Sequence, residues 1–503
     1  MSGRMCLKNF LTNERETMPN ILFVASEVYP LVKTGGLGDV AAALPVALRE
    51  IGVDVRLLLP GYPSVMDAIS PSSTHLSPHL LPTIDAVQIC RGVMPETGVP
   101  VYVLDCPKLY RREGGPYHDT HGSDWWDNEV RFAALSKAAA FLGQIGHELD
   151  FPVDLIHCND WQTGLTPAYQ QYLHGNQPAS LISIHNIAYQ GLYGANTVPA
   201  LGLPWDSFGV QGVEFYGLLS FLKAGLFYAD WINTVSPTYA KEIQTPDYGY
   251  GLHGLLSQRR DALTGILNGI DEQQWNPLKD QYLNAPFSAD NLAGKELNKN
   301  ALRKRLGLSE ENPNKPLFGM ITRLTHQKGI DLVIPIITTL IQEGAQFAIL
   351  GNGDKHTEHQ LRDIAMAFPD QINVTLGYDE ALAHQIEAGS DIFLMPSRFE
   401  PCGLTQMYSM HYGTIPIVRK TGGLADTVVN VSPSNIDNET ATGFVFEREN
   451  SDVLLQTALQ AMLLYRNREL WQQLQRHGMR KDFSWKHSAH EYLNLYNKLI
   501  YDF

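Results

Sequence analysis

The most constraining feature of this chain is a repeated pattern of short apolar segments, each followed by a turn and a helix-like stretch. The first series comprises ILFVASE (21–27), VDVRLLLP (53–60), VPVYVLDC (99–106), DLIHCND (154–160), SLISIHN (180–186) and WINTVS (231–236). Continuous apolar strands that alternate with helices are typical of a parallel sheet covered on both faces. The pattern therefore predicts an α/β protein.

The same pattern starts again in the second half of the chain. This series comprises LFGMIT (317–322), FAILG (347–351), NVTLGY (373–378), DIFLMPS (391–397), TIPIVR (414–419) and GFVFE (443–447). Between the two series, GILNGIDEQQWNP (265–277) gathers turn residues, as expected of a connection between domains. We predict two Rossmann-like, doubly wound domains, residues 20–265 and 266–483, that face each other across a deep cleft. The chemistry is expected in that cleft, because open α/β sheets bind ligands at the carboxyl ends of their strands.

Composition and charge exclude several classes of protein. The formal net charge of -15 argues against a nucleic-acid partner, because phosphate-backbone binding needs clustered Lys and Arg. The five cysteines include no C-x-x-C pair, which disfavours a disulfide framework or a zinc knuckle and fits the cytoplasm. No segment reaches about 18 apolar residues, so no membrane span is predicted. Residues 1–19 have no signal-peptide core and are expected to form a disordered leader.

A glycine-rich turn, KTGGLGDV (33–40), enters a helix-like stretch in the first half, and KTGGLADT (420–427) echoes it in the second. Gly35 and Gly36 let backbone amides approach an anion, the helix N-terminus adds a favourable dipole, and Lys33 adds a full charge. The plainer interpretation is an ordinary tight turn. The turn fits neither a P-loop nor a dinucleotide fingerprint, which disfavours an oxidoreductase.

Charged residues follow two strands of the second half. Arg323 and Lys328 lie just past the strand 317–322, which suits the two phosphates of a sugar nucleotide, although a solvated surface pair is the alternative. Glu400 precedes Pro401 at a predicted helix start, where a carboxylate meets backbone donors or sugar hydroxyls. The alternative for Glu400 is a carboxylate that only caps the helix.

In the first half, Asp160, His185 and Asn186 follow two apolar strands and are therefore expected to face the same cleft. An isolated His is more often a hydrogen-bonded structural residue, but the grouping of three polar residues at strand ends favours a site. The chain has no H-E-x-x-H, no paired metal-ligand spacing and no G-x-S-x-G. A metalloenzyme and a serine hydrolase are thereby disfavoured, and no metal is predicted.

These segments together resemble the bacterial glycogen synthases and plant starch synthases over roughly residues 20–500. The resemblance rests on KTGGLGDV, DNEVRFAALSKAA (127–139), HCNDWQTGL, HNIAYQG, GILNGID, TRLTHQKGID, FEPCGLTQMYSMHYGT, KTGGLADTV and FSWKHSAHEYLNLY (483–496). It implies a GT-B type fold, with the nucleotide-sugar donor on the C-terminal half and the glucan acceptor on the N-terminal half. It also implies that the helices of residues 484–503 cross back to the first domain.

The resemblance assigns residues around the donor phosphates. Lys33, Arg323 and Lys328 match the cations that neutralise the diphosphate. The backbone loop that matches beside them is formed by Thr421, Gly422 and Gly423.

The resemblance also assigns residues around the sugars. Glu400 matches the carboxylate at the glucose hydroxyls, Asp160 and His185 match reaction-centre residues, and Asn268 matches a sugar contact. Tyr117 and Tyr378 match the acceptor and nucleotide sides.

Two positions depart from related patterns. Many retaining transferases of this fold have a second glutamate eight residues after the first, whereas this chain has Tyr408, as is common in the glycogen and starch synthase branch. Gln162 stands where some relatives have His.

The activity implied is transfer of glucose from ADP-glucose to an α-1,4-glucan with retained configuration, without a cofactor. The alternatives are a starch synthase or another nucleotide-sugar transferase of this fold, and a non-catalytic glucan-binding relative. The presence of Lys33, Arg323, Lys328 and Glu400 argues against the non-catalytic alternative.

Overall fold

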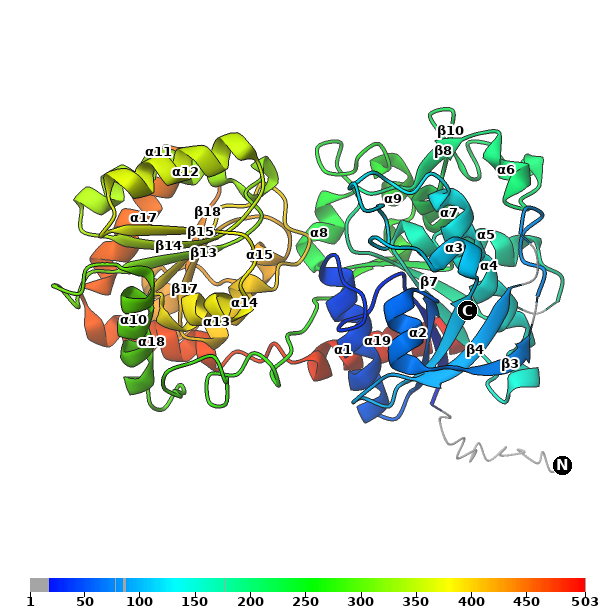
Figure 1. Ribbon diagram of the computed structural model, residues 1–503, viewed down its shortest axis with the longest axis horizontal. Helices are drawn as coiled ribbons and strands as arrows, with labels where there is room; N and C mark the ends of the chain where they lie inside the picture. The colour runs from blue at the N-terminus through cyan, green and yellow to red at the C-terminus, as the bar shows by residue number, and fades with distance from the viewer. Residues whose placement is uncertain (1–17, 77, 85–86, 176, 503) are drawn as a thin grey trace, which may run out of the picture.

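The computed structural model of the chain describes residues 18–76, 78–84, 87–175 and 177–502. It consists of two α/β lobes joined by an irregular connection (Figure 1). One lobe is built on a nine-stranded sheet and the other on a six-stranded sheet, which confirms the predicted fold class. The predicted leader, residues 1–19, lies outside the described residues except for its last two positions.

The sheet of the first lobe has the strand order β12-β11-β7-β6-β1-β2-β5-β4-β3. Its strands are β1 (Asn20–Val24), β2 (Asp54–Pro60), β3 (Ser72–Leu76), β4 (Gln88–Val93), β5 (Pro100–Asp105), β6 (Leu155–Asn159), β7 (Ala179–Ile184), β11 (Trp231–Thr234) and β12 (Leu263–Gly265). All six predicted strands are present and pair in parallel. The sequence prediction missed three strands of this sheet, because their residues form no continuous apolar run: β3 and β4, which add antiparallel at one edge, and the short β12, which adds parallel at the other. A small antiparallel sheet of β8 (Leu192–Gly194), β9 (Glu214–Phe215) and β10 (Leu218–Ser220) was also missed.

The sheet of the second lobe is parallel throughout, with the order β15-β14-β13-β16-β17-β18. Its strands are β13 (Leu317–Ile321), β14 (Gln346–Gly351), β15 (Ile372–Leu376), β16 (Ile392–Met395), β17 (Ile415–Arg419) and β18 (Phe444–Phe446). These are the six predicted strands. The central ones are buried along their length, as expected of strands covered by helices on both faces.

Helices cover both sheets. The helices of the first lobe are α1 (Gly36–Glu50), α2 (Pro63–Ile69), α3 (Pro107–Tyr110), α4 (Asn128–Ile145), α5 (Leu165–Tyr172), α6 (Thr197–Ala200), α7 (Phe221–Tyr228), α8 (Pro237–Glu242) and α9 (His253–Gln258). Those that follow are α10 (Ala293–Leu306), α11 (Ile330–Gln342), α12 (Lys355–Ala367), α13 (Glu380–Gly389), α14 (Thr405–His411), α15 (Gly422–Thr427), α16 (Pro433–Asp437), α17 (Ser451–Tyr465), α18 (Arg468–Met479) and α19 (Trp485–Tyr501). Within the described part of the chain, none of these helices combines the length and apolar character that a membrane crossing requires.

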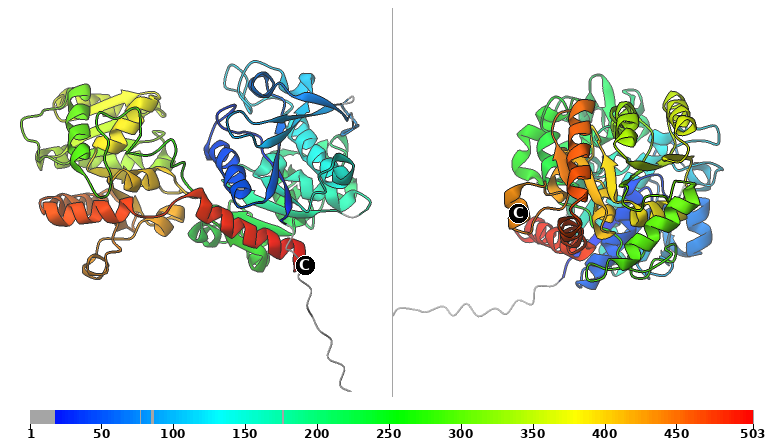
Figure 2. Two further views of the ribbon diagram at one scale, coloured as in Figure 1. Left: turned by 90° about the horizontal axis from the view of Figure 1, so that it is seen from below. Right: turned by 90° about the vertical axis from the view of Figure 1, so that its left-hand side faces the viewer.

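The last helix belongs spatially to the first lobe. Helix α19 leaves the second lobe and lies under the first, beside α1 (Figures 1 and 2). Its Tyr496 hydroxyl lies 2.8 Å from Nδ1 of the buried His157, and its Tyr492 hydroxyl accepts a hydrogen bond of 2.9 Å from Asn233 Nδ2. The chain therefore crosses between the lobes twice, once near residues 266–292 and once before α19.

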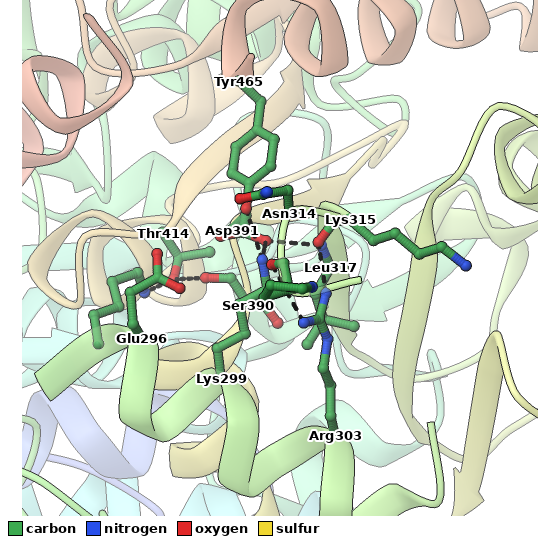
Figure 3. A network of polar contacts seen from close by, with 12 residues as sticks. Glu296, Lys299, Arg303, Asn314, Lys315, Leu317, Ser390, Asp391, Thr414 and Tyr465 are labelled. Carbon is green, nitrogen blue, oxygen red and sulfur yellow. Dashed lines mark hydrogen bonds and ion pairs between the residues drawn. The ribbon is translucent and has the colours of Figure 1, made fainter. Parts of the chain in front are cut away.

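A buried ion pair fixes α10 to the second sheet (Figure 3). Lys299 Nζ lies 2.6 Å from Asp391 Oδ2 and donates to the Tyr465 hydroxyl at 2.6 Å. The same Asp391 oxygen accepts from the Leu317 amide at 2.8 Å, and Arg303 of α10 donates to a carbonyl just before β13. Because these charges are buried, loss of one partner leaves an uncompensated charge in the core. The network holds the starts of β13 and β16, whose opposite ends carry the candidate site.

Candidate active site

The predicted site residues follow the carboxyl ends of strands from both sheets. Lys33 comes after β1, Asp160 after β6 and His185 after β7, whereas Arg323 follows β13 and Glu400 follows β16. The two edges adjoin, because α8 of the first lobe packs against α15 of the second. The Ser236 hydroxyl, which caps α8, donates to the carbonyl of the residue after Glu400 at 2.7 Å. The candidate residues of both lobes therefore follow strands whose carboxyl ends adjoin at the interface between the lobes.

Glu400 is a buried carboxylate that faces a lysine. Its Oε2 accepts from Lys328 Nζ at 2.5 Å and from the Ser397 hydroxyl at 3.0 Å. Lys328 ends a short helical turn, and Gly329 follows it at φ 70°. A Cβ on Gly329 would lie 2.2 Å from the Pro396 carbonyl oxygen, so only glycine lets this lysine approach the end of β16 so closely.

Arg323 is a second cation in the loop that carries Lys328. It is exposed in the loop after β13, and no carboxylate of the described residues forms an ion pair with it. The positive charge of Lys328 is largely balanced by Glu400, whereas that of Arg323 is open to an anionic ligand. Together they give this edge of the sheet a free cation and a buried carboxylate.

Asp160 has an unusual backbone conformation. Its φ of 54° and ψ of −171° belong to a region that residues other than glycine rarely adopt, at a cost of about 1–3 kcal/mol. Its Oδ1 accepts the amides of His185 at 2.7 Å and Asn186 at 3.3 Å, which holds the two loops together. Burial raises the pKa of this carboxyl to about 7. The strain and the shifted pKa both favour a functional role.

His185 is held as a neutral imidazole of defined tautomer. Burial lowers the pKa of its ring to about 4. Its Nε2 lies 2.9 Å from Oδ1 of Asn159, whose amide nitrogen donates to the Val24 carbonyl at 3.0 Å. Because Oδ1 is an acceptor, Nε2 carries the proton, and Nδ1 is left as an acceptor for a ligand hydroxyl.

The sequence prediction missed Glu27, a buried carboxylate just past β1. One oxygen accepts the Tyr117 hydroxyl at 2.6 Å, and the other accepts the Thr34 amide at 2.5 Å and the Gly35 amide at 3.3 Å. Glu27 thus joins Tyr117 to the glycine-rich turn, in which Lys33 is half-exposed. Its signal in the sequence was an acidic residue at the end of the apolar segment 21–27.

The loop of Thr421, Gly422 and Gly423 is buried and hydrogen-bonded within the protein. The Thr421 hydroxyl and the Gly422 amide both donate to Glu242 Oε1 of the first lobe at 3.0 Å, and the Gly423 amide donates to the Glu400 carbonyl at 3.1 Å. These amides have protein acceptors in this arrangement, whereas the prediction had the loop present them to a diphosphate. In this arrangement the loop supports the turn that carries Glu400.

The other residues that the sequence singled out differ in burial and in their contacts. Asn268 is buried, its Oδ1 has no hydrogen-bond partner within the described structure, and its backbone lies close to the Cys402 thiol. Tyr378 stands apart, 82% exposed after the edge strand β15. Tyr408 is stacked on Trp275 of the interlobe connection, with ring centroids 4.3 Å apart. The described residues contain no group of three His, Cys, Asp or Glu side chains placed to hold a metal.

Comparison with known protein families and curated proteins gives a consistent match. Residues 20–258 match the starch synthase catalytic domain and residues 304–477 match glycosyl transferases group 1. The glycogen synthase of Nitrosomonas eutropha is 51% identical, over 95% of this chain and 96% of its own length. The glycogen synthase of Rhodospirillum rubrum is 49% identical, over 95% of this chain and 98% of its own.

Solved structures of other proteins also match this chain. The catalytic domain of starch synthase IV from Arabidopsis thaliana, bound to ADP and acarbose, superposes with a TM-score of 0.86 at 34% identity, covering 96% of this chain and 100% of that one. A sucrose-phosphate synthase from Thermosynechococcus elongatus, at 16% identity over 97% of this chain and 100% of its own, shares only the fold, with a TM-score of 0.56.

Proposed function

The chain belongs to the glycogen and starch synthase family of retaining glucosyltransferases, and we propose that it transfers glucose from ADP-glucose to the non-reducing end of an α-1,4-glucan. The observation that carries this proposal is the partly buried Lys328–Glu400 pair, together with the exposed Arg323, which lies in the same loop as Lys328 and forms no ion pair among the described residues. A cation at this place suits a diphosphate, and a carboxylate suits sugar hydroxyls. The related Arabidopsis domain has ADP and acarbose bound, which supports these two ligand classes.

In the transfer mechanism that we propose, cationic side chains stabilise the departing nucleoside diphosphate. Arg323, Lys328 and Lys33 carry the charges, and a charge-assisted hydrogen bond contributes roughly 1.5–3 kcal/mol. These side chains take the place that a metal ion holds in other transferases, so we expect transfer to be insensitive to a chelator. A strict Mg²⁺ requirement in a cleaned preparation would contradict this expectation.

Retention of configuration follows from attack on the same face that the diphosphate leaves. A covalent glycosyl-enzyme needs a carboxylate nucleophile on the far face of the sugar. The position at which many other retaining transferases of this fold have a second glutamate is occupied by Tyr408, which is packed against Trp275. We therefore infer that the acceptor attacks with the assistance of the departing phosphate, while His185 Nδ1 accepts a hydroxyl of the glucose and Glu400 stabilises positive character at the sugar ring.

Two measurements test the proposal. Glucose transfer to glycogen should be faster from ADP-glucose than from UDP-glucose, and equal rates would contradict the donor assignment. Glu400→Gln should keep the fold and lower kcat with little change in donor affinity by calorimetry. If donor affinity fell instead in step with kcat/KM while kcat held, Glu400 would be a binding residue only.

We also propose that the reaction takes place in the cytoplasm. The four cysteines that the described residues include, Cys90, Cys106, Cys158 and Cys402, are all free and buried. Unpaired thiols are normal in a reducing compartment. Cell fractionation followed by an assay of transfer activity tests this location.

A further inference from the structure

Helix α8 belongs to the first lobe but contacts the second along its length (Figure 1). Besides the contacts of Ser236 and Glu242 described above, Thr238 donates from its amide and its hydroxyl to Asp426 of α15, at 2.8 and 2.6 Å. Tyr239 is the next residue of α8, and its side chain is completely buried. This tyrosine contacts two segments that carry residues of the candidate site.

The ring of Tyr239 packs against the residue that precedes Glu400. Phe399 of the second lobe lies among three tyrosine rings of the first lobe. Its ring centroid is 5.3 Å from that of Tyr239, edge to face, and 6.1 and 6.5 Å from those of Tyr250 and Tyr248. Aromatic pairs at about 4.5–7 Å contribute stabilisation beyond the burial of their surface. The segment that carries Glu400 is therefore held by side chains of the opposite lobe.

The hydroxyl of Tyr239 contacts the loop that carries His185. It accepts a hydrogen bond of 3.2 Å from the backbone amide of Ile187, which follows His185 by two residues. Burial raises the pKa of this hydroxyl well above its usual range, against the opposing effect of the Ile187 hydrogen bond, and the nearby Asp160 charge raises it further, so the phenol stays neutral. A buried amide without an acceptor costs free energy, so the hydroxyl fixes the position of this loop. One buried side chain thus joins a loop of one lobe to the Glu400 segment of the other.

We propose that Tyr239 is a positioning residue for glucose transfer, which sets the distance between the His185 loop and the Glu400 carboxylate. The inference rests on the proposed function, in which both groups act on the same glucose. Reacting groups must be held in a narrow range of geometry, and a misplacement of about 1 Å can lower a rate by on the order of 100-fold. Tyr239 presents no charge to the diphosphate, so its loss should lower kcat and leave donor binding nearly unchanged.

Removal of the hydroxyl alone is the sharpest test. Tyr239→Phe keeps the ring against Phe399 and leaves the Ile187 amide without its acceptor, so kcat for glucose transfer should fall by about fivefold or more. Donor affinity measured by calorimetry should stay within about twofold of the wild-type value. Unchanged kcat, or a fall in donor affinity with kcat held, would overturn the positioning role.

Tyr169→Phe is the matched control. Tyr169 is also a buried tyrosine of the first lobe, and its hydroxyl donates a hydrogen bond of 2.6 Å to the Leu201 carbonyl. It belongs to α5, which carries none of the candidate residues, so its replacement should lower the thermal midpoint by a similar few degrees and leave kcat unchanged. An equal fall of kcat in both variants would show that lost stability alone lowers the rate, and would overturn the role of Tyr239.

A double-mutant cycle tests the link to the other lobe. Tyr239→Leu and Phe399→Leu each remove one side of the aromatic contact. If the two rings act on the rate through each other, the loss of kcat in the double variant should be smaller than the product of the two single losses by at least about threefold. A combined loss equal to that product would show that the rings act independently, and would overturn the coupling.

Hydrogen exchange followed by mass spectrometry measures the same link without turnover. Tyr239→Leu should speed the exchange of amides in residues 397–402 of the second lobe by about threefold or more, relative to the wild type and to Tyr169→Phe. Equal exchange in all three proteins would overturn the coupling, even with full transfer activity in the wild type. If the wild type transferred no glucose but this difference appeared, the proposed function would fall and the link between the two loops would stand.

Discussion

The two KTGGL turns have nearly the same sequence but opposite surroundings. In each, a glutamate accepts the threonine hydroxyl and a backbone amide of the turn: Glu27 does so for the first turn and Glu242 for the second. Around the first turn, a Cβ added to Gly35 or Gly36 would meet no atom within 4 Å. Around the second, a Cβ on Gly422 would lie 2.0 Å from the Glu400 carbonyl oxygen.

The difference shows that a short motif does not determine its own role. The glycines of the first turn border open space, and its half-exposed lysine, Lys33, pairs with Asp39 at 2.8 Å. The second turn is clamped between the Glu400 turn and a glutamate from the other lobe, and its glycines are there because backbones touch. Both lysines form an ion pair, and that of the second turn, Lys420, pairs with Glu447 on the surface at 2.7 Å.

The largest difference in stability between the two turns should appear when one methyl group is added to each of them. In Gly423→Ala the new Cβ would lie 2.1 Å from the Cys402 carbonyl oxygen, so the two backbones must separate, at a cost of more than about 2 kcal/mol. Gly36→Ala meets open space in a helix start and should change stability by less than about 1 kcal/mol. Urea denaturation followed by circular dichroism measures both, and equal losses would show that the turns are alike.

The sequence predicted the twelve main strands and the fold class, because buried parallel strands are continuous apolar runs. It did not predict β3, β4 and β12 at the two ends of the first sheet, because none of them forms such a run. It also did not predict that Glu242 reaches across to Gly422, since a contact between lobes depends on packing far away in the sequence. Asp160 was found as a polar residue at a strand end, but its strained backbone appears only in three dimensions.

Replacing the lysine of each turn by alanine should have different effects on the transfer activity. Lys33→Ala should lower kcat/KM for the donor by at least about tenfold, because its charge serves the diphosphate, while the thermal midpoint stays within a few degrees. Lys420→Ala should leave activity within about twofold, because an exposed ion pair contributes little. Steady-state kinetics at varied donor concentration gives both values. Full activity in Lys33→Ala would remove the first turn from the site.

A smaller effect is expected from Glu242, which we infer to be a positioning residue for the Glu400 turn. Glu242→Ala leaves the Thr421 hydroxyl and the Gly422 amide without their acceptor, so kcat should fall by about threefold at unchanged donor KM. Glu242→Gln keeps an acceptor oxygen and should restore most of the activity. Glu310→Gln, at an exposed position of the second lobe, is the control and should have no effect. A rise in donor KM with constant kcat would show that the second turn contacts the donor after all.

The smallest effect is a pH dependence that reports the surroundings of the second turn. Burial raises the pKa of Glu242 above its ordinary value of 4.5, against the opposing effect of the hydrogen bonds from Gly422 and Thr421. Because the folded state holds this proton more tightly than the unfolded state, the stabilisation is complete below pH 4.5 and is lost as the pH rises through the raised pKa.

The thermal midpoint of the wild type, relative to Glu242→Gln, should therefore fall as the pH is raised from 4.5, and then level off once the carboxyl is ionised. Differential scanning calorimetry of both proteins in one buffer series measures this difference. If the wild type gained stability relative to Glu242→Gln over that range, the turn would favour an anion, as its resemblance to the first turn predicts. The contrast between an open, ligand-facing turn and a closed, structural one would then fail.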